Sequence, residues 1–313
     1  MFKTIRMLTR LGTRQGKMAD KALGYLCRTL RASKVDFVIE SFSTCIPMFK
    51  KAELVIDEKR IGCVGCGLTS GRIPTTSTAS SLVSSRLMID TPVIYCNAKC
   101  PVPSPTNFSF APAIGVSPAI LKRLVSAKSS RASLVVKKQK TIGHYLLVGN
   151  MKDPKTLVFS HYDSLGPGAV DNASGTAIAL SAAAELNRKG DLGSTLFVFD
   201  GNEEVSYDYP TYWGHGYREF EKRYSKLLKK AERIIVADCV GQGKSAFIKD
   251  PHIVNLAFPL KGIHDLKGKI SILSGNFEKL MAVYHSELDL STQISGVDLE
   301  RARKLLVRAC SGR

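Results

Sequence analysis

The sequence predicts an α/β fold in which a mainly parallel mixed sheet carries helices on both faces, with an inserted β-rich subdomain. From Tyr145 onward, short apolar runs alternate with helix-like segments, which is the pattern of a sheet built from strands and crossover helices. Between about residues 60 and 140, glycine, serine, threonine and proline are dense, which indicates an interruption of that pattern. The chain has 313 residues and is 44% apolar, so it is long enough for one large globular domain with an insertion.

The segments outside the interruption are assigned from the spacing of their apolar residues. Residues 1–32 carry leucine and isoleucine at helical spacing among basic residues, which predicts two helices separated near Gly12 or Gly16. Residues 35–42 alternate in part between apolar and polar side chains, as a strand does. The helix expected at 172–189 is rich in alanine and can therefore pack closely on the sheet. The other expected strands are 145–148, 156–160, 194–199, 233–237, 253–258 and 269–273, and the other expected helices are 215–231 and 297–310.

The interrupted region has expected elements of its own. Runs at 87–89, 92–95 and 133–136 predict short strands. Ser117 is followed by a proline, which predicts a helix N-terminus there. The expected division of the chain is an N-terminal part of the main domain at 1–48, an insertion at 49–141 and the rest of the main domain at 142–313.

The formal net charge is +18, and the basic residues are scattered along the chain. This distribution favours a solvated basic surface. Nucleic-acid binding is the alternative, and no nucleic-acid motif supports it. The N-terminus is charged from Lys3 onward without a following apolar stretch, which is unlike a signal peptide, and no run of about 18 apolar residues predicts a membrane span. We therefore expect a cytoplasmic protein that contacts no membrane.

Eight cysteines are numerous for a reducing compartment. Inside the insertion, two residues separate Cys63 from Cys66, and three separate Cys96 from Cys100. This spacing is compatible with an additional structural zinc, with one or more disulfides, or with unlinked thiols. The sequence leaves these alternatives open.

Histidine and carboxylate side chains recur where the expected strands end or where the next helix begins. Ligands of open α/β sheets bind at the carboxyl ends of the strands, so these side chains are expected to converge. Nitrogen and oxygen donors of this kind suit Zn²⁺, and a pair of cations can acidify a shared water and polarise a carbonyl. The set consists of His161, Asp171, Glu203, Glu204, Asp238 and His285.

The arrangement of these residues suggests separate roles. Glu203 and Glu204 are adjacent, so their side chains point in different directions, and one can bind metal while the other acts as a general base. A metal-bound histidine also needs a partner for its second ring nitrogen. Asp163, two residues after the first histidine, and Asp289, four residues after the second, are the candidates.

These residues lie in motifs that resemble the co-catalytic dizinc aminopeptidase family of peptidase clan MH, whose relatives include glutamate carboxypeptidase and the transferrin receptor. Five separated motifs agree with the family in order over residues 145–290. They are His161-x-Asp163, Gly168-Ala169-Val170-Asp171-Asn172-Ala173-Ser174-Gly175, Glu203-Glu204, Val236-Ala237-Asp238-Cys239-Val240-Gly241 and Tyr284-His285-Ser286-x-x-Asp289.

The resemblance implies the zinc-exopeptidase fold and a site for two zinc ions. Asp171 would bridge the two ions, and the peptide bond after it would be cis, as it often is in the family. Glu203 would be the general base that takes a proton from the water and passes it to the leaving amine. The remaining implied ligands are His161 and Asp238 at one ion, and Glu204 and His285 at the other.

Two further segments are interpreted through the resemblance. The insertion resembles the family's protease-associated domain, which caps the cleft and limits access to it. The family's short turn after the glutamate pair is replaced here by an aromatic loop, which holds the only tryptophan of the chain. Tyr209, Tyr212 and Trp213 are expected to shape the pocket for the first side chain of the substrate. The alternative is that they pack the loop against the core.

The sequence therefore predicts a zinc-dependent exopeptidase, and first of all an aminopeptidase that hydrolyses N-terminal residues of peptides. A carboxypeptidase or a glutaminyl cyclase on the same fold is an alternative, as is a catalytically silent binding or scaffold protein. A basic pocket would favour the carboxypeptidase, whereas the complete ligand set with Glu203 argues against a silent protein. Peptide substrates are the expected partners, and a homo-oligomer is compatible with the sequence.

Overall fold

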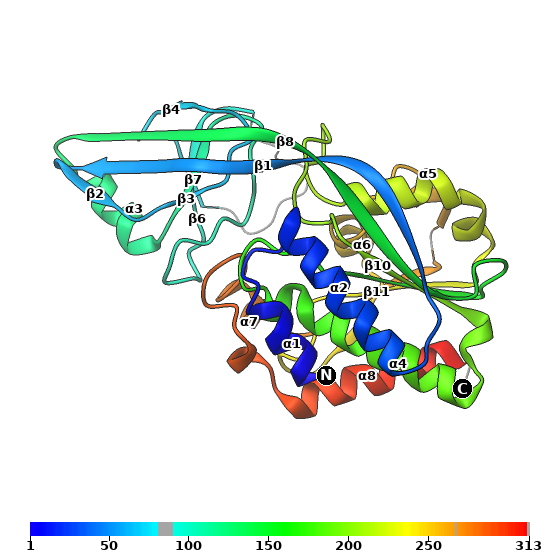
Figure 1. The fold of residues 1–313 in the computed structure, drawn as a ribbon. Coiled ribbons are helices and arrows are strands. Elements are labelled where there is room, and N and C mark those ends of the chain that lie inside the picture. The colour runs from blue at the N-terminus through cyan, green and yellow to red at the C-terminus, as the bar shows by residue number, and fades with distance from the viewer. Residues whose placement is uncertain (81–89, 267, 312–313) are drawn as a thin grey trace.

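The computed structural model describes residues 1–80, 90–266 and 268–311, and it confirms a mixed α/β sheet with helices on both faces (Figure 1). In spatial order, the strands of the main sheet are β12 (Ala246–Ile248), β13 (Ile270–Ser274), β11 (Arg233–Ala237), β9 (Thr156–His161), β10 (Thr195–Asp200), β8 (Ser130–Gly149), β1 (Val38–Ile56) and β2 (Lys59–Ile61). The four strands β13, β11, β9 and β10 run parallel, whereas β12, β8, β1 and β2 are paired antiparallel.

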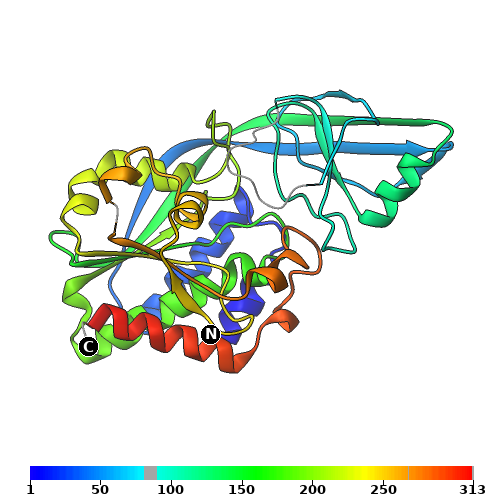
Figure 2. The same ribbon diagram turned by 180° about the vertical axis from the view of Figure 1, so that it is seen from behind.

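The central strands are apolar because both faces of the sheet are covered. Every residue of β9 and β10 is buried, as expected for parallel strands with helices on each side. One hydrophobic core lies between the sheet and one group of helices, and a second core lies on the opposite face (Figures 1 and 2). The first group comprises α1 (Phe2–Thr9), α2 (Lys17–Ala32), α4 (Gly175–Lys189) and α8 (Gly296–Ser311), and the second comprises α5 (His215–Lys230) and α6 (Pro251–Ala257).

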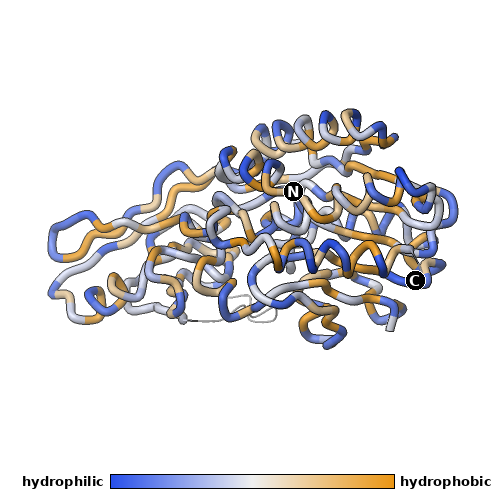
Figure 3. Tube along the Cα trace, turned by 90° about the horizontal axis from the view of Figure 1, so that it is seen from below, coloured by the Kyte–Doolittle hydropathy of each residue, from blue (hydrophilic) through white to orange (hydrophobic). Residues whose placement is uncertain are grey.

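The helices carry both polar and apolar residues along their length (Figure 3). The alanines of α4 let this helix lie close to the sheet, and most of its residues are buried. Among the described residues, no helix is both long and apolar enough to span a membrane.

The inserted part is connected to the main sheet by two long strands rather than by loops. β1 and β8 pair from Val38 and Leu147 at one end to Ile56 and Ser130 at the other, and Figures 1 and 2 show this pair extending from the main sheet into the insertion. The expected boundaries at 48/49 and 141/142 fall inside these strands. The insertion adds β4 (Gly71–Ile73) beside β8, the helix α3 (Pro118–Val125), and a second sheet of β3 (Val64–Gly65), β7 (Ala113–Val116), β6 (Val93–Cys96) and β5 (Thr78–Ala79).

One expected strand is a helix in the structure. Residues 253–258 were expected to be extended, but they belong largely to α6. Asp250 caps this helix, because its carboxylate accepts hydrogen bonds from the backbone nitrogens of His252 and Ile253, and Pro251 occupies the first turn. The Asp-Pro pair is a helix-start signal that outweighs the short apolar run. The strand expected at 87–89 lies outside the described residues.

Candidate metal centre

The site is assembled at the carboxyl edge of the parallel strands. His161 is the last residue of β9, the two glutamates follow β10, and Asp238 follows β11. Because these strands are neighbours with the same direction, their ends place the side chains at one edge. Asp171 comes from the turn Ala169–Ser174 before α4. His285 follows the short helix α7 (Phe277–Met281).

Asp171 lies between the two histidines of the site. Its Oδ1 is 3.3 Å from Nε2 of His161, and its Oδ2 is 3.5 Å from Nε2 of His285. Nε2 of His161 is also 3.5 Å from Oδ1 of Asp238, and Nε2 of His285 is 3.0 Å from Oε2 of Glu204. The donors therefore form two groups that share one carboxylate. Oε2 of Glu203 lies 4.0 Å from Nε2 of His161, so the six expected residues are brought together.

The donor atoms suit zinc. His161, Asp171 and Glu204 are buried, and one ligand atom from each lies within 4.8 Å of the others. Within the described part of the chain, Oε1 of Glu204 is buried without a hydrogen-bond partner, which is costly unless another group satisfies it. Mixed imidazole and carboxylate donation is what Zn²⁺ accepts. The residues present therefore fit the metal that the motifs imply.

Carboxylates outnumber histidines in this buried space, and the pKa values reflect it. Burial raises the pKa of Glu203 well above its ordinary range, and neighbouring carboxylates, including Glu204, raise it further. Burial and the charge of Asp171 raise the pKa of Glu204 to about 7. Burial disfavours a charged His285, but the carboxylates around it prevail and raise its pKa to about 10. This excess of negative charge makes the space attractive to a cation.

Cys239 also lies beside the site. Its thiol is 3.3 Å from Oδ1 of Asp238, and it forms a compact group of metal-ligating side chains with Asp171 and Asp238. Burial and the neighbouring carboxylates raise the pKa of this thiol well above its usual value.

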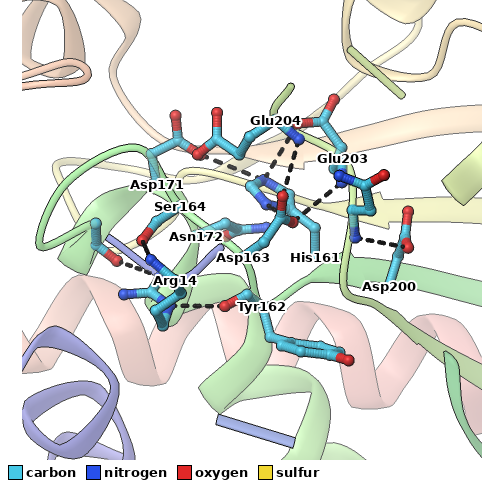
Figure 4. A network of polar contacts seen from close by, with 12 residues as sticks. Arg14, His161, Tyr162, Asp163, Ser164, Asp171, Asn172, Asp200, Glu203 and Glu204 are labelled. Atoms are coloured by element: carbon cyan, nitrogen blue, oxygen red, sulfur yellow. Dashed lines mark hydrogen bonds and ion pairs between the residues drawn. The ribbon is translucent and has the colours of Figure 1, made fainter. Parts of the chain in front are cut away.

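Asp163 lies where the sequence places it, next to the first histidine. Its Oδ1 is 3.4 Å from Nδ1 of His161. The same carboxylate accepts hydrogen bonds from the backbone nitrogens of Glu203, at 3.1 Å, and Glu204, at 3.0 Å (Figure 4). Asp163 thus connects the histidine at the end of β9 to the glutamate pair after β10.

The expectation that Asp289 supports His285 is wrong. Nδ1 of His285 instead lies 2.9 Å from the backbone carbonyl of Pro105, which belongs to the insertion. Asp289 accepts hydrogen bonds from the backbone nitrogens of Val170, at 2.7 Å, and Asp171, at 3.1 Å. The carboxylate therefore holds the turn that carries Asp171, because the chain after His285 folds back toward that turn.

The insertion makes further contacts with the segment before His285. Nδ2 of Asn97 donates to the carbonyl of Met281 at 2.8 Å, and Oγ of Ser104 donates to the carbonyl of Tyr284 at 2.5 Å. Sequence reasoning missed these residues and Pro105, since about 180 residues separate each pair and no local pattern connects them. The insertion therefore contributes directly to the support of one histidine of the site.

A pocket with a volume of about 160 Å³ opens beside the carboxylates. Tyr212 and Trp213 line it, as expected, and Nε1 of Trp213 donates to the carbonyl of Leu256 at 2.9 Å. The expectation for Tyr209 is wrong: its side chain is 68% exposed and lies against Phe110 outside this pocket. The aromatic loop thus shapes the pocket with its second half only.

The cysteines of the insertion are free thiols. No disulfide joins any of the eight cysteines, all of which lie in the described ranges. Cys63, Cys66, Cys96 and Cys100 are also absent from the groups of metal-ligating side chains found in the described part of the chain. The alternatives of a disulfide or an additional structural zinc are therefore not supported.

Gly168 begins the turn that carries Asp171, and the peptide bond between Asp171 and Asn172 is cis, as the resemblance implies. Gly168 has a φ of +57°, and a Cβ there would lie 2.4 Å from the backbone oxygen of Asp171 and 2.5 Å from Cβ of Ser164. The first of these contacts is with backbone, which cannot swing aside. This position therefore requires glycine for both its conformation and its space.

We expect Gly168→Ala to destabilise the protein and to weaken zinc binding. The matched control is Gly190→Ala, because Gly190 has a φ of +75° and nothing within 4 Å of the added Cβ. The free energy of unfolding of the control should fall by about 1–2 kcal/mol from the unfavourable backbone conformation alone. Urea unfolding and zinc titration compare the stability and the zinc affinity of the two variants. Equal losses of stability in both would contradict a steric clash between the added Cβ at Gly168 and the backbone of Asp171.

The covered sheet brings histidines and carboxylates together at the carboxyl ends of its strands, an arrangement suited to binding zinc. Residues 145–255 match the family described as Peptidase family M28. The matched segment contains the motifs from His161 to Asp238 that resemble the dizinc aminopeptidase family. No curated protein matches the chain.

Solved structures share the fold over nearly the whole chain. BSAP, a zinc aminopeptidase from Bacillus subtilis, is 18% identical with a TM-score of 0.66, covering 98% of this chain and 92% of that one. An aminopeptidase from Aneurinibacillus sp. strain AM-1 is 14% identical with a TM-score of 0.60, covering 99% and 92%. A glutaminyl cyclase from Porphyromonas gingivalis is 13% identical with a TM-score of 0.54, covering 99% and 96%. At these identities the likeness is one of fold.

Proposed function

We propose that the protein is a zinc-dependent aminopeptidase that removes N-terminal residues from peptides. The observation that carries the proposal is the placement of Asp171, whose two oxygens face two different histidines at 3.3 and 3.5 Å. A carboxylate placed in this way is suited to bridge two cations. His161 and Asp238 would complete one zinc site, and Glu204 and His285 the other. Bound there, the two zinc ions would polarise the scissile carbonyl and acidify the attacking water.

Glu203 is the proposed general base. Its side chain is only 12% exposed, and its Oε2 lies 4.0 Å from Nε2 of His161, at the edge of the ligand group. Burial raises the pKa of this carboxyl, which makes its carboxylate a stronger base. The carboxylate would take a proton from the attacking water and deliver it to the leaving amine.

The pocket supports recognition of the amino end of a peptide. Among the described residues that line it, Trp213, Leu256, Phe277 and Met281 present apolar surface, and none is a lysine or arginine. A carboxypeptidase would need a cation for the substrate carboxylate, whereas the carboxylates at the pocket wall suit a protonated amine. The volume of about 160 Å³ is close to that of a cavity known to hold benzene, so one large apolar side chain would fit.

A glutaminyl cyclase is the second candidate. The fold match to cyclases of this kind favours it, since the same pocket could enclose an N-terminal glutamine. The silent alternative is disfavoured because the donor groups and Glu203 are all in place. Peptides are the proposed partners, and the cytoplasmic location and a homo-oligomer stay predictions.

A substrate screen distinguishes these activities. We expect hydrolysis of leucine and phenylalanine p-nitroanilides, no turnover of N-acetylated versions, and loss of activity with a zinc chelator. Conversion of an N-terminal glutamine peptide to its cyclic product, without amide hydrolysis, would establish the cyclase instead. Release of C-terminal residues from blocked peptides would establish the carboxypeptidase, and turnover that is insensitive to the chelator would overturn the proposed zinc chemistry.

A further inference from the structure

Arg14 is completely buried in the turn between α1 and α2, and it is not one of the proposed metal ligands. Its guanidinium donates hydrogen bonds to three backbone carbonyls: Nε to Tyr162 at 2.6 Å, Nη1 to Pro167 at 2.6 Å and Nη2 to Gly168 at 3.0 Å. Its backbone nitrogen donates to the carbonyl of Ser164 at 3.1 Å. Arg14 thus donates hydrogen bonds to several backbone carbonyls of a single loop, most of them from its side chain (Figure 4).

The loop held by Arg14 connects two residues of the metal centre. Tyr162 directly follows His161, and Gly168 comes three residues before Asp171. The guanidinium therefore contacts both ends of the loop, next to a proposed terminal ligand and next to the proposed bridging ligand. Because the guanidinium is planar and rigid, these contacts fix the distance between the two ends.

Gln15 extends this support to the glutamate pair. Its Nε2 donates to Oδ2 of Asp163 at 2.9 Å. That carboxylate faces Nδ1 of His161 and accepts hydrogen bonds from the backbone of the glutamate pair. Two consecutive residues of the N-terminal turn therefore reach the loop after β9 and the carboxylate that orients its histidine.

Burial of a guanidinium is costly, and here no carboxylate forms a direct ion pair with it among the described residues. Burial lowers the pKa of Arg14 to about 10, while the charges of nearby carboxylates, Asp163 first among them, oppose this shift. The group is therefore still protonated at neutral pH. Its positive charge lies near a group of carboxylates that repel one another when no cation is bound, and it offsets part of that repulsion.

We propose that Arg14 and Gln15 are positioning residues of the metal centre, which hold His161 and Asp171 at the separation that zinc binding requires. The inference rests on the proposed zinc site, although it does not depend on which peptide or amide is the substrate. Neither side chain touches a metal or a substrate; both act through the loop 162–168 and through Asp163.

The test measures zinc affinity directly. Metal-free full-length protein would be titrated with zinc in competition with a chromophoric chelator, for the wild type, Gln15→Ala and Arg14→Lys. Lysine keeps the positive charge but cannot donate to three carbonyls in one plane. The matched controls are Gln139→Ala, at a half-buried glutamine of β8, and Arg28→Lys, at an exposed arginine of α2. Thermal unfolding of each metal-free protein and turnover with increasing zinc would be recorded alongside.

Loss of an outer partner of a ligand typically costs 10–100-fold in metal affinity, and we expect a loss in that range for Gln15→Ala and Arg14→Lys. The controls should bind as the wild type does. The metal-free Gln15→Ala protein should unfold at the wild-type temperature, and excess zinc should restore its turnover. If Arg14→Lys fails to fold, Gln15→Ala decides the question alone.

Zinc affinities of Gln15→Ala within twofold of the wild type would overturn the positioning role and leave the proposed function intact. Weakened zinc binding in the variants, together with a wild type that hydrolyses no amino-acid amide, would support the positioning role and remove the aminopeptidase. A wild-type protein that binds no zinc would overturn both.

Discussion

Glu203→Gln should bind zinc as the wild type does and lose nearly all turnover. Glutamine keeps the shape of the side chain but cannot accept a proton from water, and general-base catalysis of this kind contributes roughly 10²–10⁴-fold. The carboxylate of Glu203 lies farther from His161 than two proposed ligands do: its Oε2 is 4.0 Å from Nε2 of His161, whereas Asp171 and Asp238 lie at 3.3 and 3.5 Å. Its removal should therefore spare the metal.

The measurement combines elemental analysis of the purified variant with kcat on leucine p-nitroanilide. Glu232→Gln, at an exposed glutamate, is the control and should be fully active. Full activity of Glu203→Gln would remove this residue from the mechanism. Loss of zinc together with activity would instead place Glu203 among the ligands.

The convergence of the site could be predicted because it follows from local patterns. An apolar strand that ends in a histidine or is followed by carboxylates places those groups at the sheet edge, and neighbouring parallel strands bring the edges together. His161 and Asp238 were located in this way, and the motif around Asp171 identified the turn before α4. Each of these signals lies within a few residues of the chain.

The supports of the site could not be predicted in the same way. The carbonyl of Pro105 and the side chains of Arg14 and Asn97 reach the site across about 150 to 180 residues, and a backbone carbonyl has no residue type that could mark it. Asp289 was assigned to the histidine nearest in sequence. Its actual partners, the backbone nitrogens before Asp171 and of Asp171 itself, depend on how two distant turns meet.

Two of the predictions made from the sequence were wrong for reasons that lie within a few residues of the chain. The run at 253–258 is short and apolar, and such runs are ambiguous between strand and helix by periodicity alone. Asp250 and Pro251 resolved that ambiguity in favour of a helix. Tyr209 was grouped with its aromatic neighbours, but the chain turns between it and Tyr212, so that only the latter faces the pocket.

Asp171→Asn should damage zinc binding more than loss of any other single ligand. Among the described residues, Asp171 is the one carboxylate whose oxygens face both histidines. Its replacement therefore affects both proposed zinc sites, whereas loss of Asp238 affects one. Asparagine offers a single neutral oxygen and a nitrogen that does not bind zinc, and it removes a negative charge from between the two cations. The backbone hydrogen bonds from this turn to Asp289 do not require the Asp171 side chain, so the turn should remain in place.

Elemental analysis after dialysis, with Asp238→Asn as the comparison, measures the effect. We expect about two zinc ions per chain in the wild type, about one in Asp238→Asn and few in Asp171→Asn, whose activity should be lost at ordinary zinc concentrations. Circular dichroism of the metal-free proteins establishes that the variants are folded. Equal zinc retention in the two variants would contradict a bridge at Asp171, because a carboxylate shared by two cations cannot be replaced without weakening both sites.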